Sequence, residues 1–558
     1  MVNKRKRLPA LLLTVILSVS LAACSSNTGN QNGNGSTAAD TSSGNTASSV
    51  NEAAAEPLGK YEPAITVRTT MSETGKETLA EGDTYTNNVW TRGYEEELGI
   101  KMKYDWIVPS ANYNDKMNVT LASGDLPDIL KVTPVQFEQL HQAGMLEDLT
   151  DVYEKYASDL VKEFYSAEDG AALKPVTKDG KIYALVDYPG SLDSSDMIWI
   201  RKDWLDKLGL EEPKSLQDVI AIAEAFTFDD PDGNGKQDTY GISMNKDLPI
   251  NSFLLGYHGY LETWIKDENG QIVNGTIQPE VKQGLAELQR LYKEGVIDPE
   301  FGVKDFNKAM EELNAGKAGM WFAPQWAPFQ VMQMVKKDPN VNWLPYPVQS
   351  IDSEPAKTQN HLVLGGVFAV RKGYEHPEAL IKLLNFQAEK MFGESAEAER
   401  AKYLNGMTGL GFQNAAVFNL PANKNVKAME EVVEALETED TSKLGLEAKL
   451  FYEDIKDYRS GNLDKWHMER IFGPVSSQAV IKHYRDNDLI VMNEFIYAPT
   501  KTMSSKSATL EKLRLETFLK IIYGELPIDA FDQFVTNWKK LGGEQITAEV
   551  NEVVQANS

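Results

Sequence analysis

The chain contains a single cysteine, Cys24, so it cannot close an internal disulfide bond. A disulfide-free chain of this size must be held together by apolar burial, and about 500 residues follow the polar segment after Cys24. That length is enough for two or more compact lobes, each with a large apolar core.

The residues before Cys24 have the order of a secretory signal: a basic run at Lys4–Arg7, then an apolar run from Leu8 to Val19. The apolar run is too short to cross a bilayer, which takes about 20 apolar residues. The sequence Leu-Ala-Ala-Cys at 21–24 resembles the lipobox of bacterial lipoproteins. This resemblance implies a signal peptide over 1–23, cleavage before Cys24, and a diacylglyceryl group on its sulfur. The alternative is an ordinary signal peptide with a chance cysteine.

Residues 24–60 are rich in Ser, Thr, Asn, Gly and Ala, which predicts a flexible tether. The formal net charge is −26, and it becomes −30 without the four basic residues of the signal, 52 basic against 82 acidic. Nucleic-acid recognition needs clustered Lys and Arg, so the charge argues against such a partner and is read as favouring solubility.

Beyond the tether, strand and helix signals alternate. A strand is predicted at Ile65–Val67, a helix through Trp90–Leu98 that stops at Gly99, and a strand at Met102–Ile107. This alternation predicts an α/β lobe with a mainly parallel sheet. Ligands of such sheets bind outside the carboxyl ends of the strands. The segment 407–441 shows no strand that could be placed.

Four segments resemble, in the same order, blocks of the extracellular solute-binding proteins of carbohydrate ABC transporters, in particular the large sugar-binding lipoproteins of Gram-positive bacteria. They are SGDLPDI (123–129), IWIRKDWLDKLGL (198–210), NAGKAGMWFAPQW (314–326) and PIDAFDQFVTNWKKLGGEQITAEVNEVV (527–554). The resemblance implies a two-lobed type II periplasmic-binding-protein-like α/β fold, a ligand cleft between the lobes and extra C-terminal helices. The expected N-terminal lobe is 61–185 with 362–415, and the expected C-terminal lobe is 186–361 with 416–558.

The loop DDPDGNGKQDTYG (229–241) follows a helix predicted to start at Ser215 and carries oxygen donors in the order of an EF-hand. The bidentate Glu expected at the twelfth position is replaced by Gly241. The family resemblance, since some members carry such a loop, implies a structural Ca²⁺ site. The alternative is a metal-free turn. The candidate ligands are Asp230, Asp232, Asn234, Lys236 through its carbonyl, and Asp238.

Sugar rings pack on flat aromatic side chains, and their hydroxyl groups need a few fixed polar partners. In maltodextrin-binding relatives the block at 314–326 ends in a tryptophan that stacks on a sugar, which implies this role for Trp326. For the other candidate ligand-binding residues, the alternative to contact with a sugar is helix capping, exposure to solvent or packing in the core. Trp204 and Trp538 are expected to be core residues. The candidate ligand-binding residues are Asn88, Trp90, Asp125, Asp196, Trp264, Trp321 and Trp326.

The expected function is to capture an oligosaccharide without changing it chemically and to deliver it to the permease of an ABC importer. The protein is expected to be a monomer that a lipid anchors on the extracellular face of the cell membrane. No GxSxG, HExxH or P-loop motif is present, and the six histidines lack ligand spacing. The alternatives are a secreted glycoside hydrolase, since acidic residues are abundant, and a sugar-sensing lipoprotein. A calcium-dependent adhesion protein would need repeated β domains, which the alternation disfavours.

Overall fold

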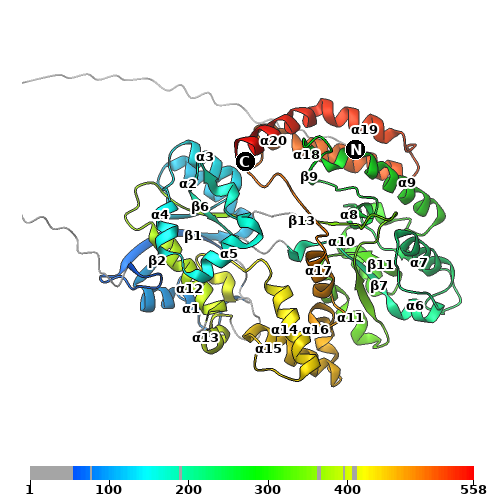
Figure 1. Ribbon diagram of the computed structural model, residues 1–558, viewed down its shortest axis with the longest axis horizontal. Coiled ribbons are helices and arrows are strands. Elements are labelled where there is room, and N and C mark those ends of the chain that lie inside the picture. Colours follow the sequence, from blue (N-terminus) through cyan, green and yellow to red (C-terminus); the bar gives the residue numbers. More distant parts are fainter. Residues whose placement is uncertain are drawn as a thin grey trace, which may run out of the picture. The chain divides into compact units, whose positions relative to one another are not determined.

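The computed structural model describes residues 55–73, 75, 78–187, 192–360, 366–393, 396–404 and 411–557. The predicted signal peptide, Cys24 and most of the tether lie outside these residues, and so do residues 361–365, where the expected C-terminal lobe segment 186–361 gives way to the expected N-terminal lobe segment 362–415. The described elements form two α/β lobes with separate apolar cores (Figure 1).

The first lobe has a core of residues from 61–186 and 367–422. Helices α12 and α13 come late in the sequence, yet they lie among the blue and cyan elements of this lobe (Figure 1). Its strands are β1 (Ile65–Glu73), β2 (Ile100–Pro109), β3 (Ile129–Val132), β4 (Thr177–Lys178), β5 (Lys181–Ile182), β6 (Ala184–Val186) and β14 (Val367–Val370). Its helices are α1 (Val89–Gly93), η3 (Tyr94–Leu98), α2 (Ser110–Ser123), α3 (Pro134–Gln142), α4 (Thr150–Tyr156), α5 (Asp159–Gly170), η4 (Lys174–Val176), α12 (Glu378–Phe392), α13 (Ala396–Tyr403) and η9 (Gly411–Asn414).

The second lobe holds the remaining cores, which draw residues from 192–356 and from 426–550. Its strands are β7 (Ile198–Arg201), β8 (Tyr240–Ile242), β9 (Trp264–Lys266), β10 (Ile272–Asn274), β11 (Ala318–Phe322), β12 (Trp343–Tyr346), β13 (Thr358–Asn360) and β15 (Ile490–Met492). Its helices up to 337 are η5 (Leu192–Ser194), α6 (Lys202–Leu208), α7 (Leu216–Phe228), α8 (Asn251–Leu255), η6 (Gly275–Ile277), α9 (Pro279–Glu294), η7 (Phe301–Val303), α10 (Phe306–Asn314) and α11 (Pro328–Lys337).

The C-terminal part of the second lobe is almost wholly helical. Trp204 and Trp538 are buried in this lobe, as expected. The segment 407–441, where no strand could be placed from sequence, contains helix α14 and no strand among its described residues. The helices are α14 (Lys424–Thr438), α15 (Leu446–Arg459), η10 (Leu463–Lys465), α16 (Trp466–Phe472), α17 (Ser477–Asp486), α18 (Lys501–Ile522), α19 (Ala530–Trp538), η11 (Lys539–Gly543) and α20 (Glu544–Ala556).

The predicted start of the first lobe is present, with longer strands. β1 pairs with β2 in parallel, and between them α1 and η3 stop at Gly99. Gly99 has a φ of 66°, and a Cβ there would lie 2.3 Å from the carbonyl oxygen of Tyr61. Any other residue at this position would be strained and would clash, so glycine fixes the helix end.

The sheets are less parallel than predicted. In the first lobe β14 runs antiparallel to both β3 and β6, and in the second lobe β7 runs antiparallel to both β11 and β12. Both β14 and β7 are the first strand after the chain has passed from the other core. A strand that follows such a crossing starts at the edge of the sheet where the neighbouring strands end. It therefore runs in the opposite direction to them.

Candidate ligand-binding site

A pocket in the first lobe lies where β1 and β3 end, at the edge where β14 begins. It holds about 890 Å³ of space open to solvent, and aromatic rings from three separate segments line it. β6 runs parallel to β3, because both pair antiparallel with β14, so β6 ends at the same edge. This is the edge at which α/β sheets bind ligands. The lining includes Thr70, Tyr113, Lys131, Phe368, Phe412, Gln413 and Phe418.

Lys131 is the charged centre of this pocket. Its Nζ lies 2.6 Å from Oδ2 of Asp187, which directly follows β6. The ammonium also lies over the rings of Phe368 and Phe418, with centroid distances of 5.3 and 5.2 Å. Burial raises the pKa of the Asp187 carboxyl, while Lys131 opposes this effect. The ion pair is therefore held in an apolar, aromatic setting.

Tyr113 of α2 joins two strands at the same edge. Its hydroxyl lies 2.7 Å from Oγ1 of Thr70 on β1 and donates to the carbonyl oxygen of Lys131 on β3 at 3.1 Å. Burial raises the pKa of Tyr113 to about 12, so the phenol is neutral and remains a hydrogen-bond donor at physiological pH.

The second lobe has its own pocket, at the carboxyl ends of the parallel strands β8 and β11. The pocket holds about 500 Å³ of space open to solvent, and the described residues of its lining carry no charged side chain. Trp326 follows β11 and precedes α11, and it is 43% exposed, whereas Trp321 within β11 is only 5% exposed. The lining includes Asn245, Phe306, Met310, Trp321, Trp326 and Gln330.

One short chain segment links the two pocket edges. β6 ends at Val186, at the edge of the first pocket, and β7 begins at Ile198, at the edge of the second. The same topology places the carboxyl ends of both lobes' parallel strands at the two ends of this crossing. Each pocket is therefore one half of a candidate site, with the crossing between them.

Asp193 and Asp196 are buried or half-buried acids of this crossing. Asp193 accepts from Nε2 of Gln478 at 3.0 Å and from Nδ2 of Asn425, and burial raises its pKa. Oδ1 of Asp196 accepts from Oγ of Ser252 at 2.9 Å. Burial raises the pKa of Asp196 to about 6, although the Ser252 hydrogen bond opposes the rise.

Asn88 and Trp90, two predicted ligand-binding residues, form hydrogen bonds within the first lobe. Asn88 is the N-cap of α1, where its Oδ1 accepts from the backbone N–H groups of Trp90 and Thr91 in a capping box. The indole N–H of Trp90 donates to the carbonyl of Gly411 at 2.9 Å, and its ring has no exposed surface. In this structure both side chains serve the fold, and neither lines the first pocket.

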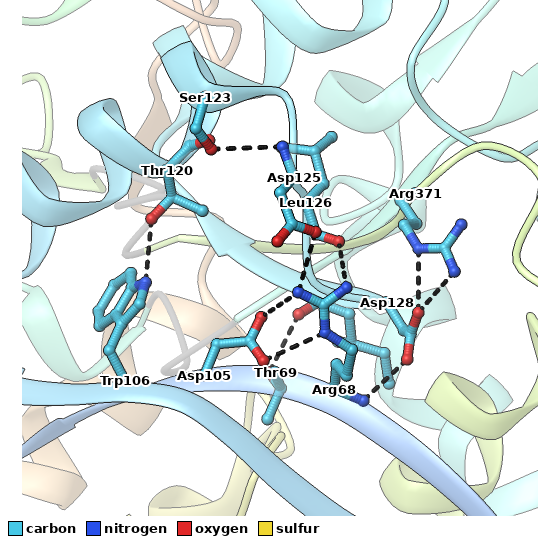
Figure 2. A network of polar contacts seen from close by, with 11 residues as sticks. Arg68, Thr69, Asp105, Trp106, Thr120, Ser123, Asp125, Leu126, Asp128 and Arg371 are labelled. Atoms are coloured by element: carbon cyan, nitrogen blue, oxygen red, sulfur yellow. Dashed lines mark hydrogen bonds and ion pairs between the residues drawn. The ribbon is translucent and has the colours of Figure 1, made fainter.

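Asp125 lies at the other edge of the first sheet, before β3 begins (Figure 2). Its carboxylate is exposed and pairs with Nη2 of Arg68 at 3.0 Å. Figure 2 shows Arg68 between Asp105 and Asp125, while the neighbouring Asp128 pairs with Arg371. The structure therefore does not bring Asp125 together with the pocket at the carboxyl end of β3.

Of the predicted tryptophans, only Trp321 and Trp326 line the same pocket. Trp264 belongs to β9 and is 6% exposed, with its ring edge-on to Phe495. Lys131, Asp187 and Tyr113 were not predicted. The available signal was a lysine inside the otherwise apolar strand Ile129–Val132, because a charge in such a strand needs a partner.

The loop after α7 gathers its oxygen donors around Asn234. Nδ2 of Asn234 donates to Asp232 at 2.7 Å and to Asp238 at 3.0 Å, and its backbone N–H donates to Asp230 at 3.0 Å. Gly233 and Gly235 have φ of 74° and 75° and allow the tight turn. Nζ of Lys317 lies 2.6 Å from Asp238. Among the described residues, no three His, Cys, Asp or Glu side chains are already arranged to hold a metal ion.

Comparison with known proteins identifies the class. Residues 76–391 match the family model of bacterial extracellular solute-binding proteins. The chain therefore belongs to this family, and its fold is the two-lobed periplasmic-binding-protein-like fold. None of the helices in the part of the chain that the structure covers is long and apolar enough to span a membrane.

Two curated relatives and one solved structure are similar to the chain over most of its length. Lipoprotein LipO of Bacillus subtilis is 25% identical over 483 residues, covering 84% of this chain and 88% of LipO. The polygalacturonan/rhamnogalacturonan-binding protein YtcQ of B. subtilis is 25% identical over 471 residues, covering 82% and 86%. The structure of an EF-hand mutant of FusA, an ABC-transporter substrate-binding protein of Streptococcus pneumoniae, in complex with fructo-nystose matches with a TM-score of 0.54 and 18% identity, covering 88% and 100%.

Proposed function

We propose that this protein is the substrate-binding component of an ABC importer and that its ligand is an oligosaccharide. The observation that supports this proposal most is the pair of aromatic pockets at the carboxyl edges of two sheets, joined by one crossing segment. Trp326 presents an exposed ring that can pack on a sugar face, and Asn245, Gln330 and Gln413 offer amides to hydroxyl groups.

The mechanism is capture and release without bond breaking. Lobes that both contact the ligand favour a closed state by their differential affinity, and a permease then recognises the closed form. The limits expected for the lobes, 61–185 with 362–415 and 186–361 with 416–558, remain part of this proposal. The protein acts as a monomer, held on the extracellular face by a lipid on Cys24.

The test is a thermal-shift screen against plant and microbial oligosaccharides, because a ligand that binds only the folded form raises the melting temperature. The bound glycan is then recovered and analysed by mass spectrometry. Recovery of the intact glycan supports a binding protein, whereas shortened products or released reducing sugar would indicate a hydrolase.

The lipid anchor has its own test in the producing cells. We expect radiolabelled lipid on the native chain and release of a Cys24→Ser variant from the membrane. An unlabelled native chain, or a variant that stays anchored, would reject the anchor.

The loop at 230–238 is proposed to bind a structural Ca²⁺ ion. Asp230, Asp232, Asn234 and Asp238 already converge through hydrogen bonds, and Lys236 adds a backbone carbonyl. Turning the Asn234 amide would present its oxygen in place of its N–H group. Bound Ca²⁺ would supply positive charge that relieves the repulsion between these acids, and the FusA structure also concerns an EF-hand.

Equilibrium dialysis tests this ion site. We expect one Ca²⁺ per chain at millimolar concentration, the weak extracellular range, and loss of binding in Asp232→Asn. Asp267→Asn, in a turn where the carboxylate accepts the backbone N–H groups of Asn269 and Gln271, is the matched control. If the native chain bound no Ca²⁺, the proposed ion site would be rejected. The acidic side chains of the loop would then be balanced by Lys317 and by the N–H groups that donate to them.

A further inference from the structure

The charges of the two pockets carry an inference about ligand class, which rests on the proposed function. We infer that the site selects uncharged oligosaccharides and excludes those built of uronic acids. The relative YtcQ, by contrast, is named for polygalacturonan and rhamnogalacturonan, the first of which is a polymer of uronic acid.

Among the residues that the structure describes, the lining of the second lobe's pocket has no charged residue, and Lys131 is the one charged residue in the lining of the first lobe's pocket. Lys131 is already paired with Asp187 at 2.6 Å, and its ammonium lies over two phenylalanine rings. Neither lining therefore offers a free cation to a carboxylate.

Lys76, which follows β1 in the sequence, is a cation outside the described residues, whereas three longer stretches outside them add no lysine or arginine. Residues 188–191 are Tyr-Pro-Gly-Ser, residues 361–365 are His-Leu-Val-Leu-Gly, and residues 405–410 are Asn-Gly-Met-Thr-Gly-Leu. None of them contains lysine or arginine. Proteins recognise carboxylates mainly with Arg and Lys, often through bidentate hydrogen bonds, and the described linings hold no unpaired residue of this kind for a uronate.

The crossing between the pockets carries Asp187, Asp193 and Asp196, and burial raises the pKa of all three carboxyl groups. Burial already destabilises the ionised forms of these acids. Another carboxylate placed beside them would be repelled and would lose its own hydration. The formal charge of −26 adds repulsion during approach.

Besides Lys76, two lysines are rival residues, Lys246 and Lys308. They follow lining residues of the second pocket in the sequence, Asn245 and Phe306, but they are not part of its lining. If they reached the ligand, binding of an acidic glycan would weaken strongly with salt, because exposed charges are screened within about 10 Å at 0.1 M salt.

The experiment uses the full-length protein and matched glycans. The thermal-shift screen contains neutral oligosaccharides and the same oligosaccharides after oxidation of their primary hydroxyl groups to carboxylates. It also contains natural uronate oligomers and their carboxyl-reduced forms. Affinities of the hits are measured by calorimetry at about 50 and 500 mM NaCl, a range over which unscreened ion pairs would lose most of their attraction.

We expect neutral glycans to bind at least about tenfold more tightly than their oxidised forms, and their Kd to change less than about twofold with salt. Gln330→Arg, which adds a cation to the lining, should narrow the tenfold gap, whereas Gln330→Leu should not. Equal or tighter binding of the uronate member of a pair would overturn the inference. If no glycan of either kind binds, the proposed function itself fails and the inference falls with it.

Discussion

The half-buried Asp196 gives the sharpest test of the electrostatics of the crossing. Its carboxyl has a pKa raised from 3.8 to about 6 by burial. A rise of this size corresponds to about 3 kcal/mol of differential stability between the protonated and ionised forms. We therefore expect Asp196→Asn to raise the free energy of unfolding at pH 7 by about 1–3 kcal/mol.

The direction in which stability changes with pH follows from the number of protons that each state binds. The folded state holds the Asp196 proton up to about pH 6, while the unfolded state loses it near pH 3.8. Between these values the folded state binds more protons, so stability decreases as pH rises through this window. Above about pH 6 the Asp196 carboxyl is ionised in both the folded and the unfolded state. The folded state then bears the full free-energy cost of the buried carboxylate. Asparagine keeps an oxygen to accept the Ser252 hydrogen bond but carries no charge.

The assay is urea unfolding of the ligand-free native and Asp196→Asn proteins at pH 7 and at pH 4. We expect the variant to be more stable at pH 7 and the two to differ by less than about 1 kcal/mol at pH 4. Asp115→Asn, on the exposed face of α2, is the control and should change stability by less than about 0.5 kcal/mol at either pH. A gap that is independent of pH, or a destabilised variant at pH 7, would refute the reasoning.

Three further predictions concern binding and packing. Trp326→Ala should abolish most oligosaccharide binding in calorimetry yet lower the free energy of unfolding by less than about 1 kcal/mol, because the ring is 43% exposed; unchanged affinity would remove it from the site. Gly302→Ala should destabilise the second lobe by about 1–3 kcal/mol in urea unfolding, because the new Cβ would lie 1.7 Å from the hydroxyl oxygen of Tyr523; an unaffected variant would contradict this close contact. Lys131→Met should lower the melting temperature by stranding the Asp187 carboxylate, and adding Asp187→Leu should recover much of the loss; no recovery would mean that the ion pair is not the cause.

Local signals in the sequence predicted much of the fold. The helix after Ser215 was read from its cap and its apolar spacing, and the structure has it at Leu216–Phe228 with Ser215 as the N-cap. Gly99 correctly marked a helix end. The direction of β7 and β14 was not predictable in this way, because it depends on where the chain returns from the other lobe rather than on local residues.

The site was less accessible to sequence reasoning. Trp326 could be singled out because its block resembles a family motif, and its exposed ring in the second pocket is compatible with that role. Lys131 and Asp187 lie 56 positions apart and meet only because β3 and β6 flank β14. Asn88 and Asp125 belong to residue types that bind sugars, but these types also cap helices and form surface ion pairs, and only the structure shows those contacts.

The central claim is that two lobes close over an intact oligosaccharide. Small-angle X-ray scattering of the purified protein, with and without a saturating glycan identified by the screen, measures this most directly. We predict a smaller radius of gyration in the presence of glycan, and a return to the original value when the glycan is dialysed away. A tightly bound glycan that leaves the radius of gyration unchanged would contradict it.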